Sequence, residues 1–183
     1  MCEPVNRLRS TEMEFGSETV IGSHVRLILM DCFETLVQLT ENGYCARKGI
    51  DRFIDHFVIN RQIPIVVISD APEAAIANAL RQAGLLARVS GIYDTRTADT
   101  LEGSRARKRL DIPLAELQID VNAAVFIGDS PLDAQAALHH QVPFIRVPRS
   151  EDRDFSFERL IAGSSKYRSG EFLVHLEQAY PKP

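Results

Sequence analysis

The stretch 25–36 (VRLILMDCFETL) constrains the fold most, because the apolar run Leu27–Met30 stops abruptly at Asp31. Continuous apolar character is typical of a strand that is buried on both faces of a parallel sheet. An acid at the carboxyl end of such a strand lies where open α/β sheets bind their ligands. A buried strand that simply ends in a turn-forming Asp would have the same sequence. The rest of the chain must therefore decide between a functional and a structural Asp31.

Apolar runs that end in polar residues recur along the chain and alternate with segments of helical periodicity. We expect further strands at 64–70, 89–93, 123–127 and 143–147, and helices at 49–60, 72–83, 100–110 and 134–140. Residues 111–113 (DIP) are expected to form a break. Strands alternating with helices predict a parallel sheet with right-handed crossovers. The fold class is therefore α/β: a three-layer, Rossmann-like parallel sheet with helices on both faces.

Outside this alternation, the sequence predicts a hairpin and two flanking segments. Asn42–Gly43 stands between short β-prone runs in 37–46, and such a hairpin would form a flap over the end of the first strand. Residues 1–18 read as a loose lead-in, and 19–21 as a short edge strand. The tail 150–183 is predicted to add two outer helices, at 155–161 and 170–178. We expect one domain that spans 1–183.

Composition excludes several classes of protein. A net charge of −4 and a pI near 5.7 argue against a general nucleic-acid binder, which would usually be basic. Three scattered cysteines are too few for a disulfide framework or a zinc site, which fits a reducing cytosol. No apolar run approaches the roughly 20 residues that span a bilayer, and the N-terminus lacks the apolar core of a secretion signal. We expect a soluble, cytoplasmic protein without a membrane partner.

Three of the predicted strand ends carry chemically useful side chains: Asp31, then Ser69, then Asp129 with Asp133. The carboxyl ends of parallel strands lie at one edge of a sheet, so these residues can meet there. Carboxylates in one cleft repel each other unless a cation lies between them, and oxygen ligands suit Mg²⁺. A hydroxyl beside the N-terminus of the next helix would hold a phosphate. This combination describes phosphoryl transfer through an aspartyl-phosphate.

Three segments resemble motifs of the haloacid dehalogenase-like superfamily, in the order of that family and over roughly residues 25–147. They are 27–36 (LILMDCFETL), 66–69 (VVIS) and 125–133 (VFIGDSPLD), which are similar to its first, second and fourth motifs. The resemblance implies a magnesium-dependent phosphohydrolase or phosphotransferase in which Asp31 is the nucleophile.

The resemblance also implies two sets of site residues. The phosphoryl group would be bound by Ser69, with Thr35 and Asp70 on the substrate side, and Thr35 would help to fix the flap turn. Magnesium would be held by the carboxylates and one backbone carbonyl, from Asp31, Phe33, Asp129 and Asp133.

The first departure from the family pattern is Phe33, two residues after Asp31. Phosphatases of the family usually carry a second Asp there, which protonates the leaving group and then activates water. Such general acid–base help typically contributes about 10²–10⁴-fold, and Phe can do neither. Glu34 is next along, but neighbouring residues at a strand end point in different directions. A second hypothesis therefore stays open, a catalytically weakened or inactive member that serves as a binding or regulatory protein.

The second departure concerns the lysine of the third motif, which would neutralise the nucleophile and the phosphate. Arg96 lies closest to the expected place, Lys108 has the right chemistry but comes late in the predicted helix 100–110, and Arg105 is a third candidate. Arg is not a neutral replacement for Lys, because its planar fork binds differently. We count Arg96 and Lys108 as candidate catalytic residues beside Asp31 and Ser69.

Two further readings of the resemblance concern other reactions and the access to the site. The 2-haloacid dehalogenases of the family also carry an aromatic residue at the position of Phe33, but they lack the acid that Asp129 provides here. The intervals from Asp31 to Ser69 and from Ser69 to Asp129 leave no room for a cap domain. An uncapped cleft would admit a phosphorylated small molecule or macromolecule, or be covered by a second subunit in a homo-oligomer.

Overall fold

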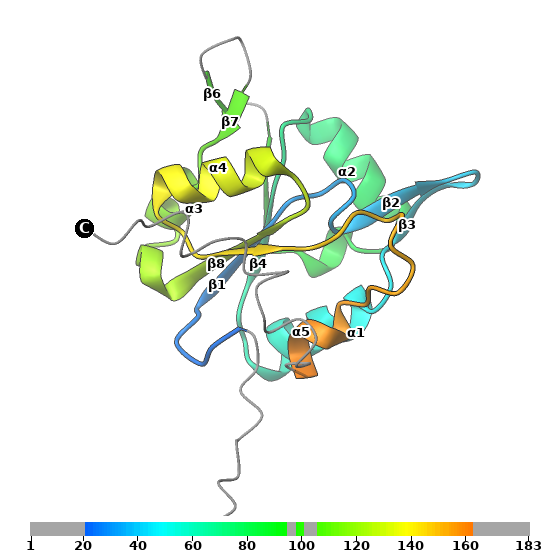
Figure 1. Ribbon diagram of the computed structural model, residues 1–183, viewed down its shortest axis with the longest axis horizontal. Coiled ribbons are helices and arrows are strands. Elements are labelled where there is room, and N and C mark those ends of the chain that lie inside the picture. Colours follow the sequence, from blue (N-terminus) through cyan, green and yellow to red (C-terminus); the bar gives the residue numbers. More distant parts are fainter. Residues whose placement is uncertain (1–20, 95–97, 101–105, 163–183) are drawn as a thin grey trace, which may run out of the picture.

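The computed structural model describes residues 21–94, 98–100 and 106–162, which are built around a five-stranded parallel sheet (Figure 1). The strands are β1 (Leu27–Met30), β4 (Ile65–Ile68), β5 (Gly91–Tyr93), β8 (Ala124–Gly128) and β9 (Phe144–Arg146), in the spatial order β5-β4-β1-β8-β9. All neighbouring pairs in this sheet are parallel. The predicted α/β fold is confirmed. The chain builds the sheet outward from β1 in one direction and then returns to the other side, so the order reverses between β1 and β8.

Alternate side chains of β1 enter two separate cores. Ile28 and Met30 belong to one buried cluster, and Leu27 and Leu29 belong to the other. All four side chains are fully buried, and each such burial contributes about 1.5–3 kcal/mol. A strand that is covered on both faces must be apolar throughout, which explains why the run Leu27–Met30 contains no polar residue.

Helices cover both faces of the sheet, as the sequence predicts. One core includes side chains from α1 (Ile50–Ile54), the π-helix η1 (Asp55–Asn60), α2 (Glu73–Gln82) and α5 (Glu158–Ala162). The other core includes side chains from α3 (Asp111–Glu116) and α4 (Pro131–His140). Figure 1 shows α4 on one side of the strands and α1 with α5 on the other. Short 3₁₀ turns, η2 (Leu86–Arg88) and η4 (Val121–Ala123), lie in the connections.

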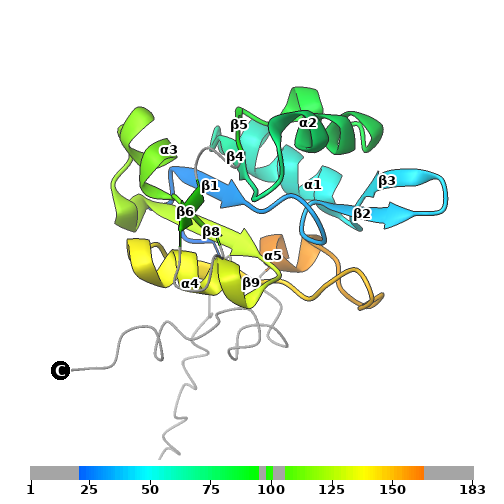
Figure 2. The ribbon, with the colours of Figure 1, turned by 90° about the horizontal axis from the view of Figure 1, so that it is seen from above.

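The predicted hairpin is present as β2 (Val37–Thr40) and β3 (Gly43–Ala46), which pair antiparallel. Figure 2 shows it extending away from the main sheet. Gly43 has φ +105°, and a Cβ there would lie 2.5 Å from Gln82 Oε1. The same oxygen accepts the backbone N–H of Tyr44 at 2.9 Å. The positive φ requires glycine in the turn, and the hydrogen bond from Tyr44 to Gln82 connects the hairpin to α2.

The predicted helix at 100–110 is wrong. Residues 98–100 form β6 (Ala98–Thr100) and pair antiparallel with β7 (Ala106–Lys108). The helix α3 begins only at Asp111, in the segment expected to be a break. Pro113 lies in its first turn, where a backbone N–H has no partner within the helix, so the proline is tolerated. The antiparallel pairing of two short strands overrides the local helical pattern.

Several other expectations are met with shifted bounds. The segment 49–60 is helical, although its second half is the π-helix η1, and α4 begins at Pro131 rather than at residue 134. The helix expected at 155–161 begins at Glu158. The lead-in 1–18, residues 19–20 and the helix at 170–178 lie outside the described residues, and the single domain without a cap stays a prediction. No helix in the described ranges is long and apolar enough to cross a membrane.

Candidate active site

Three buried carboxylates gather at the carboxyl ends of β1 and β8. Asp31 follows β1, Asp129 follows β8, and Asp133 lies in the first turn of α4. One carboxylate oxygen from each lies within 4.8 Å of the others. The two strands are neighbours in the sheet, and the strand order reverses between them. In open α/β sheets this reversal creates the crevice in which ligands bind.

Lys108 at the end of β7 supplies the cation of this cluster. Its Nζ donates to Asp31 Oδ1 at 2.7 Å and also to Asp133 Oδ1. Lys108 is only 6% exposed, and its ammonium lies 5.8 Å from the centre of the Phe126 ring. Arg96 and Arg105, the alternatives from the sequence, lie outside the described residues. Of the three basic candidates, Lys108 is the one that the described residues place beside Asp31.

Charge and burial act against each other in this cluster. Burial raises the pKa of Asp31 to about 7, Lys108 opposes this rise, and Asp133 and Asp129 add to it. Burial lowers the pKa of Lys108, but the charges of Asp31 and Asp133 outweigh this effect and raise it above its ordinary value. Lys108 therefore stays protonated across the physiological range, while Asp31 titrates near neutrality.

Both carboxylate oxygens of Asp129 accept a hydrogen bond from a side chain. The buried hydroxyl of Thr35 donates to Oδ1 at 3.1 Å, and Arg149 Nε donates to Oδ2 at 2.9 Å. Thr35 therefore joins the turn after β1 to the end of β8, which agrees with a role in fixing that turn. Arg149 was missed in the sequence, where it is one charge in a polar loop. Its place shortly after the end of β9 (residue 146), at the same sheet edge, was the available signal.

Reciprocal hydrogen bonds between Ser130 and Asp133 cap the N-terminus of α4. Ser130 Oγ accepts the N–H of Asp133 at 3.1 Å, and Asp133 Oδ2 accepts the N–H of Ser130 at 3.1 Å and its hydroxyl at 2.7 Å. Pro131 occupies the first turn, where its fixed φ suits the helix. A Cβ on Gly128 would lie 2.6 Å from Asp133 Oδ2. This reciprocal cap fixes Oδ2 and leaves the other oxygen of Asp133, Oδ1, to accept from Lys108.

Ser69 and Asp70 follow β4, the neighbour of β1 on its other side. Ser69 is buried, and its Oγ accepts the N–H of Ala71 at 3.4 Å, whereas Asp70 is exposed. Both line a cleft of about 250 Å³. Its lining is Asp31, Phe33, Glu34, Ser69, Asp70, Ala71, Lys108, Asp129, Ser130, Asp133 and Arg149. The structure therefore gathers the candidate residues of all three strand ends, and their catalytic roles stay proposals.

The side chains of the two residues after Cys32, Phe33 and Glu34, make contacts that do not serve general acid–base catalysis. The Phe33 ring packs against Tyr44 of the hairpin, with 5.5 Å between ring centroids. Glu34 has a left-handed backbone, with φ +60°. Its Oε2 accepts the N–H of Ser150 at 3.1 Å and also the hydroxyl of Ser150. The carboxylate of Glu34 thus holds the loop after β9.

Comparisons with known proteins support the fold. No family model matches the sequence, and a search among curated proteins gives no match. Among solved structures, a HAD-superfamily hydrolase of subfamily IA from Geobacter sulfurreducens is 13% identical with a TM-score of 0.54, over 69% of this chain and 93% of that one. A haloacid dehalogenase-like family hydrolase from Streptococcus pneumoniae is 11% identical with a TM-score of 0.53, over 66% and 83%.

A predicted phosphoglycolate phosphatase from Haemophilus somnus is 12% identical with a TM-score of 0.57, over 75% of this chain and 96% of that one. At such low identity these structures establish the fold alone. The chain has the haloacid dehalogenase-like fold, as its three motifs predict.

Proposed function

We propose that this chain, which has the haloacid dehalogenase-like fold, is a magnesium-dependent phosphohydrolase or phosphotransferase that works through an aspartyl-phosphate on Asp31. One observation carries the proposal: Lys108 is held between Asp31 and Asp133, beside Asp129, in a cleft at the reversal of strand order. A nucleophilic carboxylate, a fixed cation and further carboxylates at one point are what phosphoryl transfer requires.

The donor set fits a magnesium ion. Asp31, Asp129 and the backbone carbonyl of Phe33 would be its ligands, with Asp133 supporting them, and oxygen-only ligands suit a hard cation. Among the described residues, two cations face these three buried carboxylates: the buried Lys108 and the exposed Arg149. One negative charge stays unbalanced, so a further positive charge is favourable. When bound, the ion would stabilise negative charge on the phosphoryl oxygens.

The residues of the cleft support a two-step transfer. An Asp31 oxygen attacks the phosphorus of a phosphate monoester, so that a new O–P bond forms and the ester P–O bond breaks with its electron pair on the leaving oxygen. Lys108 favours the ionised form of Asp31, and the hydroxyl of Ser69 can donate to a phosphoryl oxygen. Water, or another acceptor hydroxyl, then attacks the phosphorus: a new O–P bond forms, the Asp31 O–P bond breaks with its electron pair on the restored carboxylate, and the proton of the attacking oxygen passes to solvent.

Phe33 favours the second candidate function, a protein that binds a phosphorylated ligand with little or no turnover. Its ring, packed on Tyr44, cannot protonate a leaving oxygen. Esters with poor leaving groups would therefore react slowly, whereas aryl phosphates, whose leaving oxygen needs little help, would be less affected. The carboxylate of Asp129 in the cleft argues against a 2-haloacid dehalogenase.

The deciding experiment measures release of p-nitrophenol from p-nitrophenyl phosphate by the wild type and by Asp31→Asn. We expect release that needs Mg²⁺, that stops with a chelator, and that is absent from the variant. Equal background rates in both proteins would reject the enzyme.

Beryllium fluoride with Mg²⁺ separates the two candidate functions. This complex mimics a phosphoryl group on a carboxylate, so it should raise the melting temperature of the wild type and not that of Asp31→Asn. Stabilisation without turnover would assign the chain to the binding or regulatory class.

A further inference from the structure

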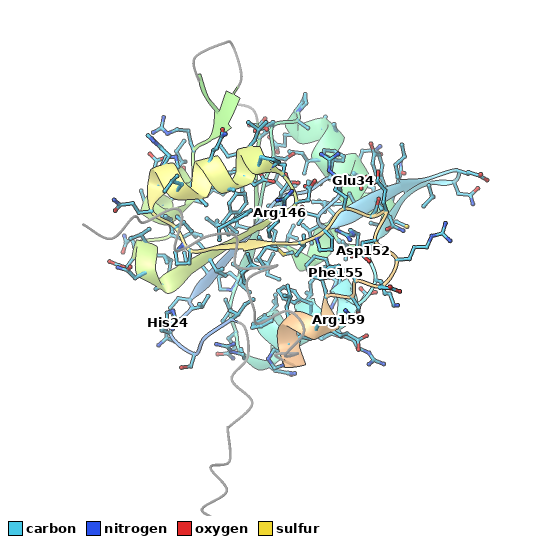
Figure 3. All side chains as sticks on the ribbon, viewed as in Figure 1. His24, Glu34, Arg146, Asp152, Phe155 and Arg159 are labelled. Atoms are coloured by element: carbon cyan, nitrogen blue, oxygen red, sulfur yellow. The ribbon has the colours of Figure 1, made fainter. Side chains whose placement is uncertain are left out.

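A second cavity, of about 390 Å³, lies between the base of the β2–β3 hairpin and the loop after β9. It is larger than the catalytic cleft of about 250 Å³. We call it the flap-side cavity, and its lining is Gln38, Leu39, Arg47, Lys48, Ser150, Asp152, Arg153 and Phe155. Figure 3 shows Asp152 and Phe155 on the loop beside the hairpin, with Glu34 nearby.

The flap-side cavity has an excess of positive charge. Arg47, Lys48 and Arg153 face one carboxylate, that of Asp152. This excess occurs in a chain whose net charge is −4, so it is a local feature and not a property of the whole surface. Clefts lined by charge of one sign concentrate ligands of the opposite sign.

Arg47 is the fixed element of this cavity. It is only 4% exposed, and its Nη1 donates to the backbone carbonyls of Glu34 at 2.5 Å and Pro148 at 2.7 Å. Its guanidinium lies 5.3 Å from the centre of the Phe155 ring and 6.0 Å from that of Phe157. These contacts hold the side chain in one place, but they are made with neutral groups.

Two donors of Arg47 remain available to a ligand, and the carboxylates that act on its charge, those of Glu34, Asp129 and Asp152, do so from beyond salt-bridge distance. In the described ranges, no carboxylate lies within salt-bridge distance of Arg47, and no acceptor takes the N–H of Nε or Nη2. Both nitrogens can be reached from solvent, because neither is among the fully buried side-chain atoms without a hydrogen-bond partner in the described residues. A buried guanidinium without a counter-charge at contact distance is costly. Its free, preorganised donors match the planar or tetrahedral oxygens of an anion.

Glu34 joins the flap-side cavity to the catalytic cleft. This residue lines the cleft, its carbonyl accepts from Arg47, and its carboxylate accepts from Ser150 of the cavity. One residue therefore forms part of the wall between the two spaces.

We propose that the flap-side cavity binds a second anionic group, a carboxylate or a phosphate, of the substrate whose phosphoryl group reacts at Asp31. This inference rests on the proposed function and names its substrate class: a phosphate monoester with a further anionic group. Arg47 binds that group from the buried side, and Lys48 and Arg153, both exposed, close around it. Leu39 and Phe155 offer apolar contact to the carbon chain between the two anions.

The test measures binding without turnover. The full Asp31→Asn chain, labelled with ¹⁵N, is titrated with phosphonooxyalkanoates of increasing chain length, and with alkyl phosphates that lack the carboxylate. At one or more chain lengths, the carboxylate series should shift the backbone amides of Lys48, Ser150 and Asp152 together with those of Ser69 and Asp129, at one common dissociation constant. The alkyl phosphates should shift only the second group.

Matched variants test the charges. Lys48→Gln with Arg153→Gln removes two exposed cations of the cavity, and Arg26→Gln with Arg81→Gln removes two exposed cations elsewhere. The cavity pair should weaken binding of the best phosphonooxyalkanoate by about tenfold, and the control pair by much less. Equal weakening by both pairs would overturn the proposal, since it would reduce the effect to net charge.

Two results would contradict the inference in different ways. If no member of either series shifts the cavity amides, the cavity binds no such anion. If acetate or inorganic phosphate shifts them but no phosphonooxyalkanoate shifts both groups at one dissociation constant, the cavity binds a free anion and not the substrate. Failure of the proposed enzyme function shows instead as absent release of p-nitrophenol by the wild type, which these titrations do not require.

Discussion

Replacing Lys108 by methionine removes one charge and little volume from the catalytic cleft. The lost ammonium lies 2.7 Å from Asp31 Oδ1 and also donates to Asp133, and all three residues are buried. Burial raises the pKa of Asp31 to about 7 even though Lys108 opposes the rise. Without Lys108 the pKa of Asp31 must therefore increase further, and less of the nucleophile is ionised at neutral pH.

Two losses follow for Lys108→Met. Removing a donor that faces charge developing in the transition state costs about 10²–10³-fold in kcat. Removing one partner of a buried ion pair costs about 3–5 kcal/mol of stability, and this is an upper value because a proton shared by Asp31 and Asp133 can replace the lost charge. The acidic limb of the rate profile, which reports ionisation of the nucleophile, should move to higher pH.

The measurement is the pH dependence of p-nitrophenyl phosphate turnover at saturating Mg²⁺, with circular dichroism to verify folding. Arg26→Met serves as the control, because it removes an exposed cation that lines neither the cleft nor the flap-side cavity. A folded Lys108→Met protein with an unshifted acidic limb and a rate near that of the control would refute the role given to Lys108.

Three further outcomes are expected. Arg149→Met should make Mg²⁺ bind severalfold more tightly by isothermal titration calorimetry, because Arg149 Nε donates to Asp129 at 2.9 Å and competes for that carboxylate; unchanged or weaker binding would contradict this competition. Phe33→Asp should raise kcat for alkyl phosphates by about 10²-fold or more and change kcat for aryl phosphates less, since it restores a general acid; an equal effect on both would argue for a merely steric change. Burial raises the pKa of Asp31 from 3.8 to about 7, so the metal-free wild type loses stability as pH rises through this interval. The gain in unfolding free energy from Asp31→Asn should therefore grow between about pH 4 and about pH 8, to about 4 kcal/mol at most, as chemical denaturation would measure; a constant difference would count against the raised pKa.

The sequence was sufficient for the parts of the site that follow buried strands. Asp31, Ser69 and Asp129 each come directly after an apolar run, and the edge of a parallel sheet brings such positions together. Asp133 lies in the polar turn that follows the same predicted strand, so it was expected near the same point, although the helix was predicted only from residue 134 and in fact begins at Pro131. These inferences need only local patterns and the general rule for parallel sheets.

The position of Lys108 in the site could not be predicted from local patterns. The basic segment around it has the composition of a solvated helix face, and the predicted helix 100–110 placed this lysine late in that helix. The structure instead pairs β6 with β7, and Lys108 becomes buried between two carboxylates. A local sequence pattern predicts neither the pairing of two short strands nor the partner of a buried charge. Arg149 was missed although it follows a predicted strand at the same sheet edge, because its contact with Asp129 depends on the path of the loop after β9.

The turn after Asp31 connects both sites through its backbone. The left-handed conformation of Glu34 aims its carbonyl at Arg47, while its carboxylate binds Ser150. The catalytic cleft has an excess of carboxylates and the flap-side cavity an excess of cations, so opposite charges lie on the two sides of one residue. A ligand with a cation-bound phosphate at one end and a free anion at the other matches both sides. Both ends of such a ligand are anionic, so this charge distribution does not by itself fix the direction of binding. The end that meets Asp31 is set by the magnesium ion proposed in the catalytic cleft, whose oxygen ligands include those of the phosphoryl group.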